Sequence, residues 1–216
     1  MKTRAVIFDW AGTVVDYGCH APPAVLTRIF AGRGVAPEPA ESRYAMGLLK
    51  IDQIRAILAL PRVREAWLAA NDGEPDAEAL FADFIPLQRE CIAEFSHVIP
   101  GVAEVVEKLR SEGILIGSTT GYTRAMMEPL LPQAAREGFA PDCLVTPDDV
   151  GAGRPAPWMI FENLKRLGVY PPGDCVKVGD TESDILEGRN AGMRTIGVCE
   201  SSNEAVLRGA DGARAL

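Results

Sequence analysis

The chain has 216 residues, 47% of them hydrophobic and 24% charged, a balance typical of a soluble globular protein that excludes a fibrous or low-complexity one. Its length is enough for one large domain or for a core with an inserted smaller unit. Asp and Glu total 30 against 22 Lys and Arg, and the resulting net charge of -8 argues against nucleic acid or anionic lipid as a partner.

The sequence also carries no sign of membrane insertion or export. No apolar run approaches the ~20 residues that a membrane helix requires, and the start MKTRAVIFDW reaches an acid too soon for a signal peptide. The five cysteines, Cys19, Cys91, Cys143, Cys175 and Cys199, form no C-x-x-C pair and no zinc-ligand spacing. We therefore predict a cytoplasmic protein without a membrane segment, whose cysteines are mostly reduced packing residues.

The first predicted element is a buried strand at residues 5–8, a short apolar run that stops at Asp9 and is followed by Gly12. Such a strand delivers Asp9 to its carboxyl end. Residues 19–98 have a different pattern: apolar residues recur with the period of a helix, and hardly any segment has the pattern of a strand. We predict helices at 23–33, 51–60, 63–70 and 76–95, with Gly, Pro or Asn at the breaks.

The rest of the chain alternates strand and helix patterns. After Pro100 and Gly101, apolar residues at 102, 105, 106 and 109 mark one face of a helix. Further strands are predicted at 114–117, 143–145, 176–178 and 195–198. The fold class is therefore α/β, with a Rossmann-like parallel sheet core at 1–18 and 99–216 and an inserted all-helical cap at 19–98. The cap would cover the sheet edge where open α/β folds bind ligands.

Polar residues follow several of the predicted strands. The four stretches are Asp9 in FDWAGT, Ser118-Thr119-Thr120 in GSTTGYT, Arg154 in GRPAPW, and Asp180 with Asp184 in VGDTESD. Each alone is weak, but in this order and spacing they resemble the four motifs of the haloacid dehalogenase superfamily. The resemblance implies a Mg²⁺-dependent hydrolase with a Rossmann-like core.

Elementary chemistry supports that interpretation. A carboxylate at a strand end can attack phosphorus if a cation neutralises the phosphoryl oxygens. Asp9 and Asp180, with Asp184 as a further candidate, offer the hard oxygen ligands that Mg²⁺ prefers. Thr119, Thr120 and Arg154 are candidates for binding phosphate oxygens. The alternative is that the acids merely cap helices and that the Thr and Arg residues are ordinary turn and surface residues.

Position 11 indicates the kind of bond that is broken. Phosphatases of the superfamily resemble one another in carrying a second Asp two positions after the nucleophile, where it protonates a departing alkoxide, and here that position is Ala11. A carbon leaving group needs an electron sink instead, and a protonated imine provides one. Lys50 in MGLLKID follows an apolar stretch that would lower its pKa, so it is the candidate amine, although alone it would be read as a surface lysine.

Six segments together closely resemble the phosphonoacetaldehyde hydrolases, or phosphonatases. They are DWAGT, Tyr17-Gly18-Cys19, MGLLKID, GSTTGYT, VTPDDVGAGRP-PW and KVGDT-SD. The resemblance implies a dimer formed through the caps, Asp9 as nucleophile, Lys50 as the imine lysine, and a metal site of Asp9, the Ala11 carbonyl and Asp180. It also implies substrate-site positions at Cys19, Met46, Gly47, Thr120, Arg154, Thr181 and Asp184, although Cys19 and Met46 are equally compatible with core packing.

Two departures from the family pattern set limits. The family usually has His three residues after the imine lysine, where this chain has Gln53, which can hydrogen-bond but cannot carry a proton near neutral pH. We therefore hypothesise that His20, beside Cys19, relays the proton, the alternative being an exposed linker histidine. The family also continues beyond the last shared strand, whereas this chain runs into a short Ala, Gly and Arg ending that suggests a lost edge element or a divergent branch.

The predicted function is cleavage of the C–P bond of phosphonoacetaldehyde, a small phosphonate, to acetaldehyde and phosphate through a lysine Schiff base and an aspartyl phosphate. One alternative is a Mg²⁺-dependent phosphohydrolase of shifted substrate. Another is a catalytically weak homologue that retains the phosphate pocket and the dimer surface.

Overall fold

A computed structural model describes residues 2–92 and 94–203 of the chain. Its centre is a five-stranded parallel sheet in the order β3-β2-β1-β4-β5. The strands are β1 Ala5–Phe8, β2 Leu115–Thr119, β3 Cys143–Val145, β4 Cys175–Gly179 and β5 Arg194–Gly197. β1 lies in the middle with all four residues buried, as expected for an apolar run covered on both faces of a parallel sheet.

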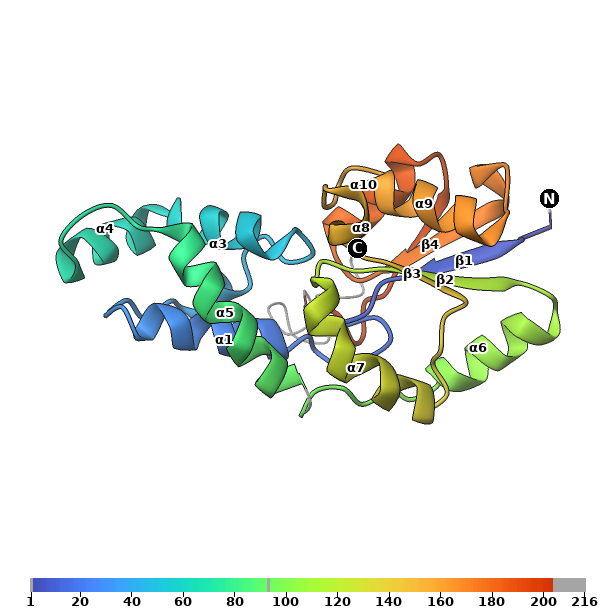
Figure 1. Cartoon of the computed structure of the whole chain (residues 1–216), viewed down its shortest axis with the longest axis horizontal. Coiled ribbons are helices and arrows are strands. Elements are labelled where there is room, and N and C mark those ends of the chain that lie inside the picture. The colour runs from blue at the N-terminus through green and yellow to red at the C-terminus, as the bar shows by residue number, and fades with distance from the viewer. Residues whose placement is uncertain (1, 93, 204–216) are drawn as a thin grey trace.

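Helices cover both faces of the sheet (Figure 1). On one face lie α8 Pro147–Val150, α9 Trp158–Leu167 and α10 Glu182–Asn190, and on the other lie α6 Val102–Ser111 and α7 Arg124–Arg136. The short 3-10 helix η1 Pro172–Asp174 precedes β4. This doubly covered parallel sheet confirms the predicted α/β fold class.

The segment inserted after β1 is helical in the described residues and lies beside the sheet (Figure 1). Its helices are α1 Ala21–Ala31, α2 Pro39–Ser42, α3 Lys50–Leu58, α4 Pro61–Ala70 and α5 Ala77–Ile92. α5 packs along α1 and α3, and fully buried Phe30, Ile54 and Phe84 lie in the shared apolar core. The division of the chain at residues 19 and 98 remains a proposal, and we keep the name cap for this segment.

The predicted elements were largely correct in kind and shifted at their ends. The prediction did not include α2, because four residues give too short a pattern to detect. It also did not delimit α7, which continues through Pro129 and Pro132. Proline inside a helix normally argues against one, but here the buried side chains of Met126, Met127 and Leu130 hold the helix against the core.

Three further sequence predictions concern the membrane, the C-terminal ending and the cysteines. None of the described helices is long and apolar enough to cross a membrane. The short ending that departs from the family pattern falls mostly in residues 204–216, outside the described residues. All five cysteines are free thiols, in agreement with the predicted reduced state.

Candidate active site

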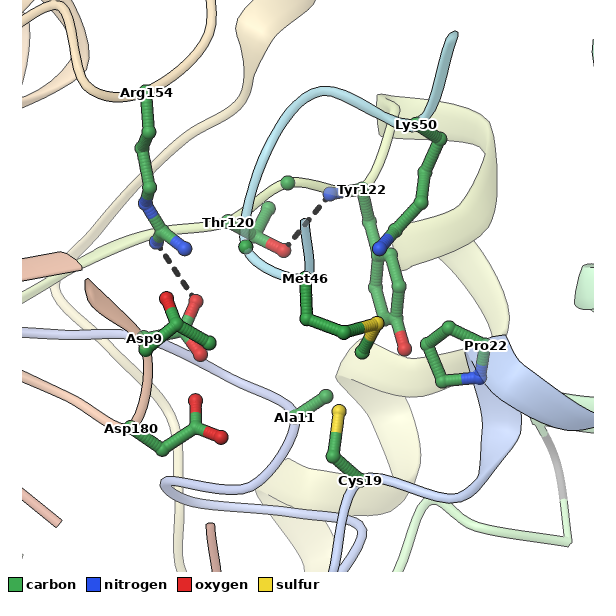
Figure 2. Close-up of a pocket in the computed structure, with 13 residues that line it drawn as sticks. Asp9, Ala11, Cys19, Pro22, Met46, Lys50, Thr120, Tyr122, Arg154 and Asp180 are labelled. Atoms are coloured by element: carbon green, nitrogen blue, oxygen red, sulfur yellow. Dashed lines mark hydrogen bonds and ion pairs between the residues drawn. The ribbon is translucent and has the colours of Figure 1, made fainter. Parts of the chain in front are cut away.

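Asp9 lies at the carboxyl end of the central strand, as the sequence predicted. Its backbone N–H donates to the Val178 carbonyl of β4 at 2.9 Å, so the sheet itself fixes the residue. The side chain is 8% exposed and lines a small pocket between the sheet and the cap (Figure 2). Burial raises the pKa of Asp9, while the positive charge of Arg154 opposes that shift.

Asp180 directly follows β4 and lies beside Asp9, and the turn after β1 leaves room for its side chain. Gly12 has a φ of 82°, and a Cβ built there would lie 2.4 Å from Asp180 Oδ2. Only glycine combines that conformation with so close an approach. Asp180 Oδ2 accepts the Asn203 backbone N–H at 2.8 Å, whereas Oδ1 is buried and has no partner among the described residues.

These carboxylates fit a divalent metal. Oxygen atoms of Asp9, Asp180 and Asp184 lie within 4.8 Å of one another, and all three residues are buried. Burial and the neighbouring charges of Asp9 and Asp184 raise the pKa of Asp180 well above its usual range, the environment that a bound cation would reverse. Asp9 and Asp180, with the adjacent Ala11 in the pocket wall, would hold a Mg²⁺ ion with the hard oxygen ligands it prefers.

Asp184 is less available to a metal than the other two acids. Its Oδ1 contacts Lys177 Nζ at 2.7 Å and Arg154 Nη1 at 3.0 Å, and its Oδ2 accepts the Thr181 hydroxyl at 2.5 Å. It closes a capping box with Thr181 at the start of α10. Burial would raise the pKa of Asp184, but the Arg154 and Lys177 charges outweigh it and lower the pKa. The helix-capping alternative therefore describes part of what Asp184 does, although not Asp180.

Arg154, from the loop between α8 and α9, reaches the nucleophile directly. Its Nη2 lies 2.7 Å from Asp9 Oδ1, and its side chain is 1% exposed. Burial alone would lower the pKa of the guanidinium, but Asp184, Asp9 and Glu187 together raise it. The predicted phosphate-binding arginine thus stands at the pocket as a permanent cation beside Asp9 (Figure 2).

Of the two predicted threonines, only Thr120 reaches the pocket. Its hydroxyl accepts the Tyr122 backbone N–H at 3.0 Å, and it lines the cavity. Thr119 is completely buried and is bonded to Arg154 and Glu187 instead. Because side chains alternate along a strand, neighbouring residues at its end cannot both face the same space. The structure does not bring Thr119 to the pocket as a direct phosphate ligand.

Lys50, the predicted imine lysine, lies in the opposite wall of the pocket. Lys50 is the first residue of α3 and is 3% exposed, so the surface-lysine alternative is wrong. Burial lowers its pKa from 10.5 to about 8, although the negative charge of Asp9 opposes that shift. Its Nζ donates to Gln53 Oε1 at 2.8 Å and lies 5.7 Å from the centre of the Tyr122 ring (Figure 2).

Gln53 is held in one orientation by its amide nitrogen. Nε2 donates to the Tyr44 carbonyl at 3.1 Å and to Met46 Sδ at 2.9 Å. The amide oxygen is thereby turned toward Lys50. It can accept a hydrogen bond from Lys50 Nζ, but it cannot exchange a proton with it. Burial raises the pKa of the Cys19 thiol and the Tyr122 hydroxyl well above their usual ranges, so these two side chains carry no charge at neutral pH.

The cap loop before Lys50 rests directly on the core. Ser183 Oγ donates to the Met46 carbonyl at 3.0 Å. Gly47 has a φ of 85°, and a Cβ there would lie 2.3 Å from Thr181 Oγ1. The Met46 and Gly47 positions predicted to lie near substrate therefore do line the pocket, together with Cys19 and Thr181.

His20 is the predicted residue that lies apart. It is exposed, its Nδ1 is 3.2 Å from Arg43 Nη2, and its ring lies 6.4 Å from that of Phe95. Within residues 2–92 and 94–203, it neither lines the pocket nor contacts Lys50 or Gln53. The hypothesis that His20 relays a proton to the imine lysine therefore gains no support, and the linker-histidine alternative describes its place better.

Sequence reasoning missed three residues of this region. Tyr122 stands within the GSTTGYT motif but received no role, because an aromatic residue there looks like ordinary packing. Lys177 and Glu187 are completely buried charges. A lysine inside the otherwise apolar run CVKVG was the available signal, since a buried charge requires a partner.

Comparison with known proteins gives consistent similarities. The profile of the haloacid dehalogenase-like hydrolases matches residues 3–192. Proteins named phosphonoacetaldehyde hydrolase from Bacillus cereus and Bacillus cytotoxicus are 51% and 52% identical over 210 residues, which is 96% of this chain and 80% of each relative. A crystal structure of a phosphonoacetaldehyde hydrolase-like protein from Oleispira antarctica has a TM-score of 0.93 and 38% identity, covering 100% of this chain and 79% of that one.

Proposed function

The chain belongs to the haloacid dehalogenase-like hydrolase family, and from that premise we propose that it hydrolyses phosphonoacetaldehyde to acetaldehyde and phosphate. The observation that carries the proposal is the pairing, in one small pocket, of a buried lysine of lowered pKa with a buried carboxylate at a strand end. The substrate has one group for each: an aldehyde for Lys50 and a phosphonyl group for Asp9. The names of the relatives support the same substrate.

Lys50 acts first. With a pKa of about 8, roughly one lysine in eleven is neutral at pH 7, against about one in three thousand at 10.5. The neutral amine adds to the aldehyde carbon, and the resulting carbinolamine loses its oxygen as water to leave a protonated imine. Gln53 accepts a hydrogen bond from Nζ throughout, and solvent supplies the proton that departs with the oxygen.

Asp9 then attacks phosphorus. A P–O bond forms while the P–C bond breaks, and its electron pair moves toward the imine nitrogen to give an enamine, so no acid is needed at Ala11. Arg154, already 2.7 Å from Asp9 Oδ1, reduces the repulsion between two anionic partners. A Mg²⁺ ion at Asp9 and Asp180 would supply further neutralisation of the phosphonyl oxygens.

Two hydrolyses complete the cycle. Water attacks phosphorus of the aspartyl phosphate, which releases phosphate and restores the Asp9 carboxylate. The enamine takes a proton at its terminal carbon, and water hydrolyses the imine to acetaldehyde and free Lys50. One water is released and two are consumed, so the net reaction uses one water per C–P bond cleaved.

The test is incubation with phosphonoacetaldehyde and Mg²⁺ while acetaldehyde and phosphate are measured together. Equal amounts of both products are expected, and borohydride added with substrate should inactivate the enzyme by reducing the imine, with the added mass located on Lys50. The variants Asp9→Asn and Lys50→Arg should both be inactive. Turnover of phosphate esters with no adduct on Lys50 would instead indicate a phosphohydrolase of another substrate.

Two expectations from the family resemblance are part of the same proposal. We propose that the enzyme acts in the cytoplasm and forms a homodimer through the cap. Light scattering of the purified chain should give twice the mass of 23.2 kDa, and a monomer at assay concentrations would contradict the dimer.

A further inference from the structure

Glu187 is a buried carboxylate that the proposed mechanism does not use. It lies on α10, one helical turn beyond Asp184, so the two acids share a face of the helix. Its side chain has no solvent exposure, and Oε1 has no partner among the described residues. A carboxylate in such a place needs strong partners to remain there.

Those partners form a closed ring of three hydrogen bonds. Arg154 Nε donates to Glu187 Oε2 at 3.0 Å. The Thr119 hydroxyl donates to the same oxygen at 3.0 Å and accepts from Arg154 Nη2 at 2.9 Å. The ring fixes the rotation of the Thr119 hydroxyl and the plane of the guanidinium together, and the Nη2 that takes part in it also contacts Asp9 Oδ1 at 2.7 Å.

The charged groups of the ring are paired with neighbouring charges of opposite sign. Lys177 Nζ lies 2.7 Å from Asp184 and 3.7 Å from Glu187, and Arg154 contacts both acids. Two cations and two anions are thus paired beneath the pocket. If Glu187 lost its charge, Lys177 and Arg154 would compete for Asp184 Oδ1. The guanidinium would also lose the charged partner that its Nε contacts on the side away from Asp9.

We propose that Glu187 is a positioning residue, which acts through Arg154 and Thr119 to aim the guanidinium at Asp9 and at the phosphonyl group. This rests on the proposed function for the identity of the substrate, but the geometry it concerns exists without substrate. It also gives Thr119 a function: the strand-end threonine orients the arginine instead of binding phosphate.

The first test is Glu187→Gln, which keeps the shape and an acceptor oxygen but removes the charge. We expect kcat to fall by roughly 10- to 100-fold with KM within about 3-fold of wild type, because the loss is in alignment at the reaction step. The matched control is Glu162→Gln. Arg166 Nε donates to Glu162 Oε1 at 2.8 Å at the surface, so the same substitution in a similar ion pair away from the pocket should leave kcat unchanged.

A second measurement does not depend on turnover. The Nε–H proton of Arg154 is buried and hydrogen-bonded, so it should give a slowly exchanging NMR signal in the substrate-free wild type, assigned by its loss in Arg154→Lys. In Glu187→Gln that signal should shift or exchange rapidly. If the wild type releases no acetaldehyde and phosphate, the proposed function fails, while this signal still decides whether Glu187 orders Arg154.

If Glu187→Gln does not fold, Thr119→Val tests the same proposal. It is nearly isosteric, breaks the same ring, and should lower kcat by about 3- to 10-fold while disturbing the same Arg154 signal. The combined variant should lose less than the product of the two single effects, since both act on one arginine. Wild-type kcat in the folded variants, or a reduced kcat with an unchanged Arg154 signal, would overturn the proposal.

Discussion

We predict that the hydrogen bond between Lys50 and Gln53 raises the pH at which the proposed activity appears. Only the neutral amine attacks an aldehyde, so kcat/KM of the wild type should rise about tenfold per pH unit on the acid side and level off above the pKa of about 8. The ammonium form donates to Gln53 Oε1 at 2.8 Å. This bond stabilises the charged form and opposes the effect of burial.

The substitution Gln53→Met removes that acceptor with little change in length. A hydrogen bond to a charged group contributes about 1.5 kcal/mol, and about 1.4 kcal/mol corresponds to one pH unit. We therefore expect the midpoint of the acid limb to move from about 8 to roughly 7. The neutral fraction of Lys50 at pH 7 would rise from about one in eleven to about one half, while the plateau falls because the amine is less well aimed.

The assay is the pH dependence of acetaldehyde release between pH 6 and 10, together with the pH dependence of borohydride trapping. Gln88→Met is the matched control, because Gln88 is also a completely buried cap glutamine and its amide has no partner among the described residues. Its midpoint should remain at the wild-type value. A midpoint for Gln53→Met that stays in place or moves upward would refute the reasoning that Gln53 sets the ionisation of Lys50.

Three other outcomes are expected. Chelation of Mg²⁺ should abolish phosphate release. Mg²⁺ should also raise the melting temperature of the wild type but not of Asp180→Asn. At a Mg²⁺ concentration of 100 times Kd, the stabilisation of the wild type should be about 2.7 kcal/mol. In urea denaturation, Gly12→Ala should lower the free energy of unfolding by roughly 1–2 kcal/mol more than Gly151→Ala does. Both glycines have a positive φ, but of the two only Gly12 lies against a side chain. Equal losses would contradict the close approach to Asp180. His20→Ala should keep kcat within about 2-fold, well short of the effect of a lost acid–base group, and a 10-fold loss measured by steady-state kinetics would revive the proton relay.

The sequence predicted the fold well because its strands are short apolar runs that end in polar residues. Asp9 and Asp180 follow neighbouring parallel strands, and parallel strands end at the same edge, so their proximity followed from the class of fold. Lys50 required the family resemblance. Nothing in a local pattern indicates that a helix 41 residues later in the chain faces that edge.

The failures have a common physical cause. Thr119 and Thr120 are neighbours in sequence and were treated alike, but the alternation of a strand sends one side chain to the pocket and the other beneath it. His20 is next to Cys19 and was placed with it for the same reason. Glu187 was not considered because its importance lies in contacts with Arg154 and Thr119, which are distant along the chain. Side-chain direction and tertiary partners decide these roles, and neither is visible in spacing.

The enclosed space in the pocket also bears on how catalysis must proceed. The volume open to water is about 20 Å³, room for roughly one enclosed water molecule. We expect the pocket to widen when the proposed substrate enters, and the contacts that would be released are those of the loop at Met46 and Gly47 with Ser183 and Thr181. Because that loop leads directly into Lys50, the same movement would also displace the amine. Under the proposed mechanism, imine formation and attack by Asp9 would both take place in the closed arrangement, in which the cap would hold Lys50 at the aldehyde and exclude the water that would otherwise compete.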